Sequence, residues 1–233
     1  MVAEFKVRGF CLCIDDDVIL FLFLFSFIGK EWGNIEGYPI VCLHGLADNC
    51  DSFAPLAPLL SEKFHYIAMD AFGHGLTTHV PPGPPMNYWE KVIYVKRLVD
   101  HFKMEKFSII GHSMGGSTGL LFASLYPDLV DRLLTLDIIK PVTVPLAWHT
   151  QDITEAIDLH LEMERKSQDP KYQKSYTQEQ LVNRYVEAMG GAINPEAVRV
   201  LMKRGSKVSG NGFIFSHDPR MVNKKFPYSQ FTG

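Results

Sequence analysis

The sequence predicts an α/β fold in which a mostly parallel sheet is covered by helices on both faces. From residue 39 onward, short apolar runs typical of buried strands alternate with stretches at helical spacing. The runs are continuous, whereas a strand with one face in solvent would alternate apolar and polar residues. Parallel strands need crossover connections, which the helical stretches supply. The predicted strands are Pro39–Leu43, His65–Asp70, Phe107–Gly111 and Arg132–Asp137.

The predicted helices fall into two groups. Three alternate with the strands, at Asp51–Ser61 (with Asp51 as N-cap), Asn87–His101 and Gly115–Tyr126. Three follow one another with no strand between them, at Thr150–Lys166, Thr177–Met189 and Asn194–Arg204. We therefore expect a core over residues 29–140, an inserted helical cap over residues 141–211, and a return to the core over residues 212–233.

The N-terminal segment, residues 1–28, contains the apolar run Val18–Ile28. This run is shorter than the ~20 residues that span a bilayer. Three aspartates precede it, where a signal peptide would carry positive charge. We expect a buried strand or an atypical N-terminal segment, with a signal or membrane anchor as the less favoured alternative.

Composition narrows the classes of partner. The chain has 233 residues, 46% of them hydrophobic, and a net charge of -3, without a basic stripe that would indicate nucleic-acid binding. Its four cysteines include the close pair Cys11 and Cys13, which has no second cysteine pair or nearby histidines at zinc spacing, so no metal site is expected. Cys42 lies in a predicted buried strand. A reducing compartment fits this cysteine usage.

The strongest chemical motif is the run GHSMGG at Gly111–Gly116. It matches G-x-S-x-G between a predicted strand and a predicted helix, the context of a nucleophile elbow. Because the chain turns sharply at Ser113, the residues two before and two after must be small, as Gly111 and Gly115 are. The turn would expose the Ser113 hydroxyl for attack on an acyl carbon. The alternative is a glycine-rich turn with an incidental serine.

A second motif, HGLADN, follows the first predicted strand. Acyl transfer needs two donors for the developing oxyanion, and the backbone N–H groups of Leu46 and Met114 are the candidates. We expect His44 and Gly45 to order this loop. His44 precedes the nucleophile in the chain and is therefore a poor candidate for the general base.

The third motif, DAFGHG, begins at Asp70. Asp70 ends a predicted strand, and we expect its carboxylate to hold the following loop by accepting hydrogen bonds from backbone N–H groups. A catalytic role for Asp70 is the less favoured alternative.

Together these motifs resemble the α/β-hydrolase superfamily, and more closely the serine hydrolase-like proteins of animals. The matching positions are Trp32-Gly33, Cys42–Gly45 with Asp48-Asn49, Ala68–Asp70 with Gly73–Gly75, and Gly111–Gly116. The resemblance begins near Gly29, and the first 28 residues do not look like the family's opening strands. It implies an α/β-hydrolase fold with an inserted helical cap. It also implies a cytoplasmic location, with perinuclear vesicles or the peroxisome as alternatives.

The order of a catalytic triad in this fold is serine, then aspartate or glutamate, then histidine. After Ser113 the chain has His149, His160 and His217, in the predicted cap or just beyond it, and we expect none of them to be the base. Asp137 ends a strand where some hydrolases place the acid, although an ordinary strand-ending aspartate is the favoured interpretation. We therefore expect the family's C-terminal strands and histidine loop to be missing.

The sequence as a whole predicts a serine hydrolase acting on an ester, thioester or related acyl bond through a Ser113 acyl-enzyme. The expected partner is a small-molecule acyl substrate, with no metal or organic cofactor and no nucleic acid. Serine at position 113 argues against haloalkane and epoxide hydrolysis, which need a carboxylate there. Carbon–carbon bond hydrolysis, lyase chemistry and the oligomeric state stay open. The alternative function is a truncated, catalytically inactive hydrolase-like protein.

Overall fold

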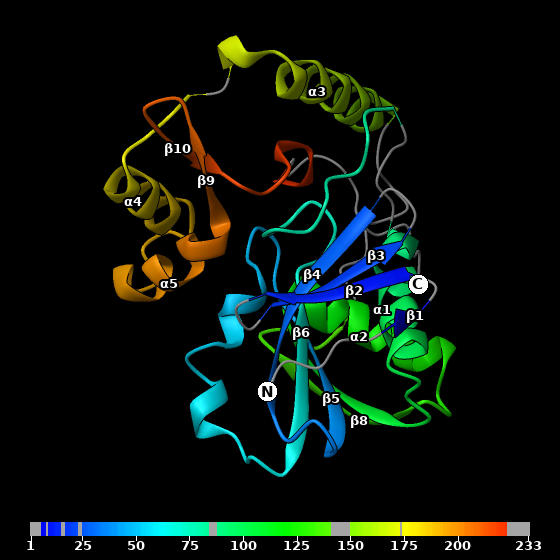
Figure 1. The fold of residues 1–233 in the computed structure, drawn as a ribbon. Coiled ribbons are helices and arrows are strands. Elements are labelled where there is room, and N and C mark those ends of the chain that lie inside the picture. Colours follow the sequence, from blue (N-terminus) through cyan, green and yellow to red (C-terminus); the bar gives the residue numbers. More distant parts are fainter. Residues whose placement is uncertain are drawn as a thin grey trace.

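A computed structural model describes residues 6–7, 9–14, 17–22, 25–83, 88–140, 150–172 and 174–222. An eight-stranded sheet forms its centre (Figure 1). The strands are β1 Lys6–Val7, β2 Gly9–Ile14, β3 Asp17–Leu22, β4 Phe25–Gly33, β5 Tyr38–Leu43, β6 Phe64–Met69, β7 Phe107–His112 and β8 Val130–Leu136. The predicted α/β fold class is confirmed.

The sheet has the order β1-β2-β3-β4-β6-β5-β7-β8. The last four strands in this order are parallel to one another, and each overlaps one of the four strands predicted from the sequence. The strands β1 to β4 are antiparallel, and β4 joins this half to the parallel half by pairing with β6. The carboxyl ends of the parallel strands therefore meet at one edge of the sheet, where the sequence places its polar motifs.

The N-terminal run differs from the single buried strand that we predicted. It forms the antiparallel pair β3 and β4, in which Leu20 lies opposite Phe27. The uninterrupted apolar run conceals this division, because both strands are apolar. The expected boundary after residue 28 falls within β4. No helix in the described part of the chain combines the length and apolar character needed to cross a bilayer.

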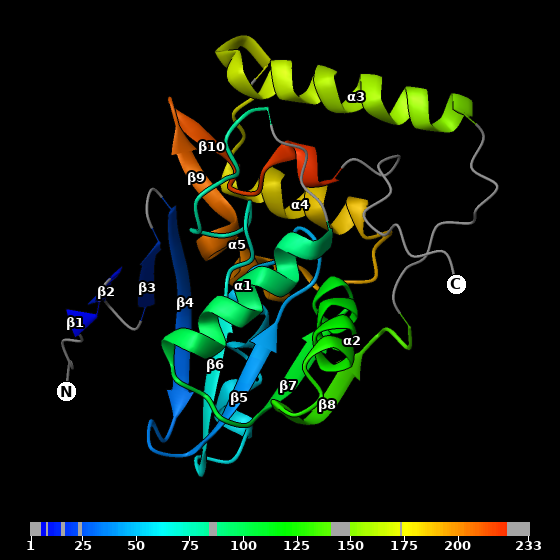
Figure 2. The same cartoon turned by 90° about the vertical axis from the view of Figure 1, so that its right-hand side faces the viewer.

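Two helices, α1 Tyr88–His101 and α2 Met114–Leu125, cover one face of the sheet (Figure 2). Val95 and Val99 of α1 and Phe122 of α2 are buried against strand residues such as Val41 and Ile109. Alternate residues of the same strands, including the buried free thiol of Cys42, pack on the opposite face in a second apolar cluster. Apolar side chains thus cover both faces of β5, β6 and β7, whereas β8 at the edge is more exposed.

The helix predicted over Asp51–Ser61 is not formed. Two short 3-10 helices, Cys50–Phe53 and Ala57–Leu59, take its place. Prolines at positions 55 and 58 lack the N–H group that a continuous helix would require. The N-cap is Asn49, whose side chain accepts a hydrogen bond from the backbone N–H of Asp51. Asp51 instead forms an ion pair with Lys30 at 2.8 Å.

Three helices beyond the carboxyl ends of the parallel strands, with the hairpin that follows them, are called the cap here (Figure 2). They are α3 Thr150–Gln168, α4 Gln178–Ala188 and α5 Pro195–Gly205, with a short 3-10 helix at Pro170–Tyr172. A capping box at Thr177 begins α4. Asn194 caps α5, with proline at the first helical position. Leu181, Val198 and Leu201 are buried between α4 and α5.

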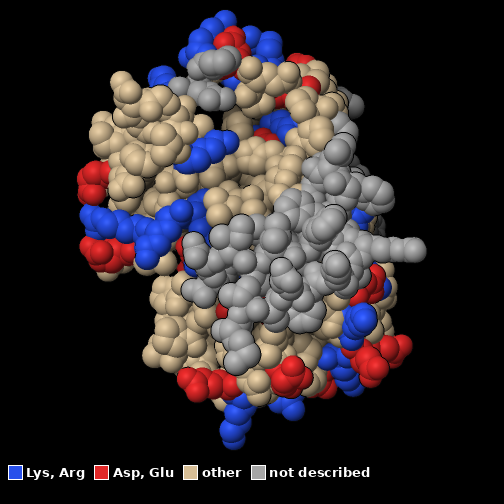
Figure 3. Space-filling model, in the orientation of Figure 1, with Lys and Arg blue, Asp and Glu red and all other residues tan. Residues whose placement is uncertain are grey.

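The hairpin of β9 Ser206–Ser209 and β10 Gly212–Phe215 was not predicted from the sequence, which indicated only a return to the core from residue 212. After β10 the chain returns to the core, where the backbone N–H of Asp218 donates to the carbonyl of Gly73 at 2.7 Å. A 3-10 helix at Pro219–Val222 follows, and Met221 is buried in the main core cluster. On the face in Figure 3, acidic and basic side chains are interspersed, notably over α4 and α5 at the left.

Candidate active site

Ser113 lies at a sharp turn between β7 and α2, where the sequence predicts a nucleophile elbow. Its φ of 49° is in the left-handed region, which a residue with a side chain rarely adopts. The backbone N–H of Ser113 donates to the carbonyl of Leu136 on β8 at 2.9 Å, which fixes the turn to the neighbouring strand. Within the described residues the Ser113 hydroxyl makes no hydrogen bond.

The glycines of the motif are required by close backbone contacts. A Cβ atom at Gly111 would lie 2.6 Å from the backbone of Gly116, and one at Gly115 would lie 2.1 Å from the carbonyl oxygen of Leu43. Because these neighbours are backbone atoms, no side-chain rotation could relieve the clash. The start of α2 is therefore pressed against the end of β5.

The two predicted oxyanion donors lie on the segments that meet at this contact. Leu46 belongs to the loop His44–Asn49 after β5, called the oxyanion loop here, and Met114 is the first residue of α2. Neither backbone N–H donates a hydrogen bond to another described residue. Ala47, next to Leu46, has a φ of 64°. Both N–H groups are thus available at the carboxyl edge of the sheet.

His44 is buried, and both of its ring nitrogens are engaged. Its Nε2 accepts a hydrogen bond from the backbone N–H of Ala71 at 2.8 Å, so the proton of the neutral ring is on Nδ1. Nδ1 then donates to the carbonyl oxygen of Gly45 at 2.7 Å. The ring therefore connects the oxyanion loop to the loop after β6, which is the ordering position expected for it.

Asp70 is completely buried, and its carboxylate holds two loops. It accepts hydrogen bonds from the backbone N–H groups of Cys50 at 2.7 Å and Leu76 at 2.9 Å. Arg204 of α5 pairs with the same carboxylate, with Nη2 2.8 Å from Oδ2. The backbone contacts have the form predicted from the sequence, whereas the arginine was not foreseen because helical spacing does not reveal a contact with the core.

Three further residues that the sequence analysis did not select lie beside the elbow. The Tyr185 hydroxyl of α4 donates to Oδ1 of Asp48 in the oxyanion loop. The other oxygen, Oδ2, lies 3.4 Å from Nδ1 of His112, the residue that precedes Ser113. Asp48 and His112 belong to the quoted motifs, but no sequence signal connects them to a tyrosine in the cap.

Among the described residues, none of the remaining triad candidates is hydrogen-bonded to Ser113. Asp137 follows β8 directly, has a φ of 56° and is exposed. His160 is buried on α3, and burial lowers the pKa of His217, after β10, to about 4. Neither ring is hydrogen-bonded to Ser113. His149 lies outside the described residues.

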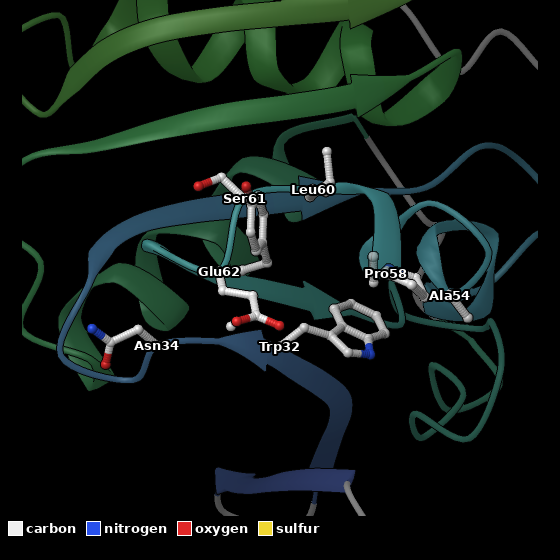
Figure 4. A pocket seen from close by; sticks show the side chains of 10 residues that line it. Trp32, Asn34, Ala54, Pro58, Leu60, Ser61 and Glu62 are labelled. Atoms are coloured by element: carbon white, nitrogen blue, oxygen red, sulfur yellow. The ribbon is translucent and has the colours of Figure 1, made fainter.

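A pocket of about 470 Å³ lies at the other end of the sheet (Figure 4). It is lined by Trp32 at the end of β4, by Tyr66 near the start of β6, and by Ser61 and Glu62 just before β6. Because β6 begins there and its carboxyl end adjoins the oxyanion loop, this pocket is separate from the Ser113 region.

Comparison with known proteins connects this geometry to a family. The family model described as alpha/beta hydrolase fold matches residues 38–191, which include the elbow and the oxyanion loop. A solved structure of a hypothetical protein from Pseudomonas aeruginosa PAO1 superimposes with a TM-score of 0.81 and 28% identity, covering 92% of this chain and 74% of that one.

Serine hydrolases and serine hydrolase-like proteins of animals are also similar to this chain. Human serine hydrolase-like protein 2 is 36% identical over 201 residues, covering 83% of this chain and 61% of that protein. A probable serine hydrolase of Drosophila melanogaster is 32% identical over 197 residues, covering 82% and 58%. The chain thus spans about three fifths of the length of these curated relatives. The resemblance to animal serine hydrolase-like proteins is confirmed.

Proposed function

Because this chain belongs to the α/β-hydrolase fold family, we propose that it is a serine hydrolase with Ser113 as its nucleophile. The observation that carries the proposal is the strained conformation of Ser113 at the turn from β7 to α2, with a φ of 49°. This geometry presents a hydroxyl at the carboxyl edge of the sheet. The substrates that we propose are small molecules with an ester, thioester or related acyl bond, and the reaction needs no metal or organic cofactor.

In the proposed reaction the Ser113 oxygen forms a bond to the acyl carbon and gives its proton to a general base. The carbonyl oxygen becomes an oxyanion that accepts hydrogen bonds from the N–H groups of Leu46 and Met114. Collapse of this intermediate releases the protonated alcohol or thiol and leaves an acyl-enzyme. Water then attacks the acyl carbon, which frees the acid and restores the serine.

The proposed reaction also requires an acid and a base. Asp137 remains a proposal for the acid, on its position directly after β8. In this fold the base is a histidine that follows the acid in the chain. Neither His160 nor His217 is assigned to that role, because neither ring is hydrogen-bonded to Ser113. The family match and the names of the relatives support a hydrolase over the inactive alternative.

A fluorophosphonate probe, which reacts with activated serines, tests the nucleophile. We expect the probe to label the wild-type chain and the Ser113→Ala variant to lose all labelling. Ser124→Ala is the matched control, because Ser124 is an exposed serine of α2 bonded only to the Leu120 carbonyl. Labelling that persists in Ser113→Ala, or is absent from the wild type, would refute the assignment.

A further inference from the structure

The oxyanion loop is fastened to the cap at two adjacent positions. Asp48 accepts a hydrogen bond from the Tyr185 hydroxyl of α4. The side-chain amide of the buried Asn49 donates to the backbone carbonyl of Leu201 on α5 at 2.9 Å. Tyr185 is itself 4% exposed and packs in the α4–α5 cluster, so its hydroxyl has a fixed position. The loop that carries Leu46 is thus held by both helices.

Asp48 also connects this loop to the nucleophile elbow. Its second carboxylate oxygen lies 3.4 Å from Nδ1 of His112. A Cβ atom placed on Gly45 would be 2.8 Å from that oxygen and 2.8 Å from the same ring nitrogen. The Asp48–His112 pair therefore lies directly against the backbone between His44 and Leu46. The pair thus packs against the backbone next to Leu46, which carries one of the two proposed oxyanion donors.

The charges around Asp48 and His112 favour the ion pair between these two side chains. Burial would raise the pKa of Asp48, but its contacts with His112 and Tyr185 outweigh burial and lower the pKa. Asp48 in turn raises the pKa of His112 against the effect of burial, and the Asp137 carboxylate adds to this shift. His44 is the other titratable group that acts on Asp48. The imidazolium and carboxylate forms of the pair thus coexist over a wider pH range than isolated groups would allow.

We propose that Tyr185, Asp48 and His112 form a bridge through which the cap helix α4 holds the oxyanion loop against the nucleophile elbow. Tyr185 is then a positioning residue for the reaction of Ser113, an inference that rests on the proposed function. The bridge is continuous from a cap side chain to the residue adjoining the nucleophile. Transition-state stabilisation by backbone donors depends on their exact placement, so loss of the bridge weakens it without removing a reacting group.

The test compares two tyrosine-to-phenylalanine variants of the cap. Tyr185→Phe removes the hydroxyl that reaches Asp48 and keeps the ring in the apolar cluster. Tyr176→Phe is the matched control, because Tyr176 packs against the same cluster and its hydroxyl makes no hydrogen bond with a described residue. We expect Tyr185→Phe to lower the rate of fluorophosphonate labelling about tenfold, the effect of losing one hydrogen bond to a charged group. The control should label at the wild-type rate.

NMR spectroscopy supplies readouts that do not depend on activity. Tyr185→Phe should shift the backbone amide signals of Leu46 and Met114, and Tyr176→Phe should leave them unchanged. In Asp48→Asn the pKa of His112 should fall by about one unit or more, because an opposite charge at this range shifts a pKa by that amount. A purely structural role for Tyr185 would lower the melting temperature of Tyr185→Phe and leave the amide signals of Leu46 and Met114 unchanged.

The outcomes separate the bridge from the proposed function. If the wild type labels and Tyr185→Phe labels equally fast, the bridge is refuted and the serine assignment stands. If the wild type does not label, the proposed function fails, and the NMR measurements alone decide whether the bridge exists. Shifted amide signals with a lowered His112 pKa would then support it, and unchanged spectra would refute it.

Discussion

The guanidinium group of Arg204 on α5 donates two hydrogen bonds to Oδ2 of Asp70 at the end of β6, over 3.1 Å from Nε and 2.8 Å from Nη2. Both side chains are buried, Asp70 completely. The same carboxylate accepts hydrogen bonds from the backbone N–H groups of Cys50 and Leu76. Asp70 therefore joins the cap to two loops of the core. A charge at this depth depends on its partner, because water cannot replace it.

Replacing Arg204 by methionine should therefore destabilise the protein strongly. Removal of one partner of a buried ion pair costs about 3–5 kcal/mol. The free energy of unfolding in urea measures the effect. Lys106→Met is the control, since Lys106 pairs with Asp131 at 3.9 Å on the surface, and we expect it to change little. Similar values for the two variants would contradict a structural role for the buried pair.

A second prediction concerns the contact between Gly115 and Leu43. Gly115→Ala would place a Cβ atom 2.1 Å from the Leu43 carbonyl oxygen, so β5 and α2 must separate. We expect labelling by fluorophosphonate to fall at least about tenfold, since one proposed oxyanion donor lies in the loop after β5 and the other at the start of α2, and we expect stability to fall by about 1–3 kcal/mol.

Gly119→Ala, on the same helix, is the control for this substitution. The added Cβ atom would meet only side-chain atoms, of Ile109 and Leu133, at 3.0 Å. Alanine in place of glycine also favours the helix by about 1 kcal/mol. It should keep both activity and stability. Equal losses of labelling and stability in the Gly115 and Gly119 variants would show that the backbone contact between Gly115 and Leu43 is not the cause.

The sequence predicted the parallel strands because each is a continuous apolar run bounded by turn residues. The prediction was wrong where individual residues opposed the structure that the apolar periodicity indicated. Between residues 51 and 61 the prolines broke the predicted helix, and the Asp51 side chain was engaged by Lys30. The β9–β10 hairpin had a readable signal, because Gly210 with a φ of 57° stands in the turn run Gly-Asn-Gly.

The candidate site was predictable only where its residues are close in the sequence. Ser113, Gly111 and Gly115 form one motif whose spacing carries its own steric reason. Tyr185 and Arg204 reach their core partners across 137 and 134 positions. Helical spacing shows only which face of a helix is apolar, so it cannot indicate which buried carboxylate such a residue meets.

The pH dependence of stability should reflect His217. Burial, with a contribution from His79, lowers the pKa of His217 to about 4, against about 6.5 in an unfolded chain. The folded state then binds fewer protons, so stability falls as pH falls through 6.5, and the loss levels off below about 4. His217→Gln should remove up to about 3 kcal/mol of this pH dependence.

Urea denaturation at several pH values between 4 and 7 measures this slope. A smaller slope should persist in the variant, because burial also lowers the pKa of His74. The carboxylates Asp48 and Asp218, whose pKa values are lowered despite burial, lose their contribution only at still lower pH. An identical slope in wild type and His217→Gln would show that the ring is not buried in its neutral form.

The edge strand β8 makes the last prediction. Among the described strands it pairs only with β7, and it exposes apolar side chains at Leu134, 54% exposed, and Leu136, 38% exposed. Ile139, just beyond the strand, is 93% exposed. An edge with unpaired backbone groups and apolar side chains favours pairing with another chain. We expect this chain to express poorly or to form soluble oligomers.

Leu134→Lys tests this directly, because a charge on an edge strand opposes pairing and the exposed position leaves the core unchanged. Size-exclusion chromatography should show a shift toward monomer with the melting temperature retained. Leu59→Lys is the control, since Leu59 is 81% exposed on the short helix Ala57–Leu59, outside the strand. If the unsubstituted chain already elutes as a sharp monomer peak and melts cooperatively above about 50 °C, within the usual range for mesophile domains, then β8 is not an associating edge. If both lysine variants reduce association equally, general charge repulsion rather than edge pairing is responsible.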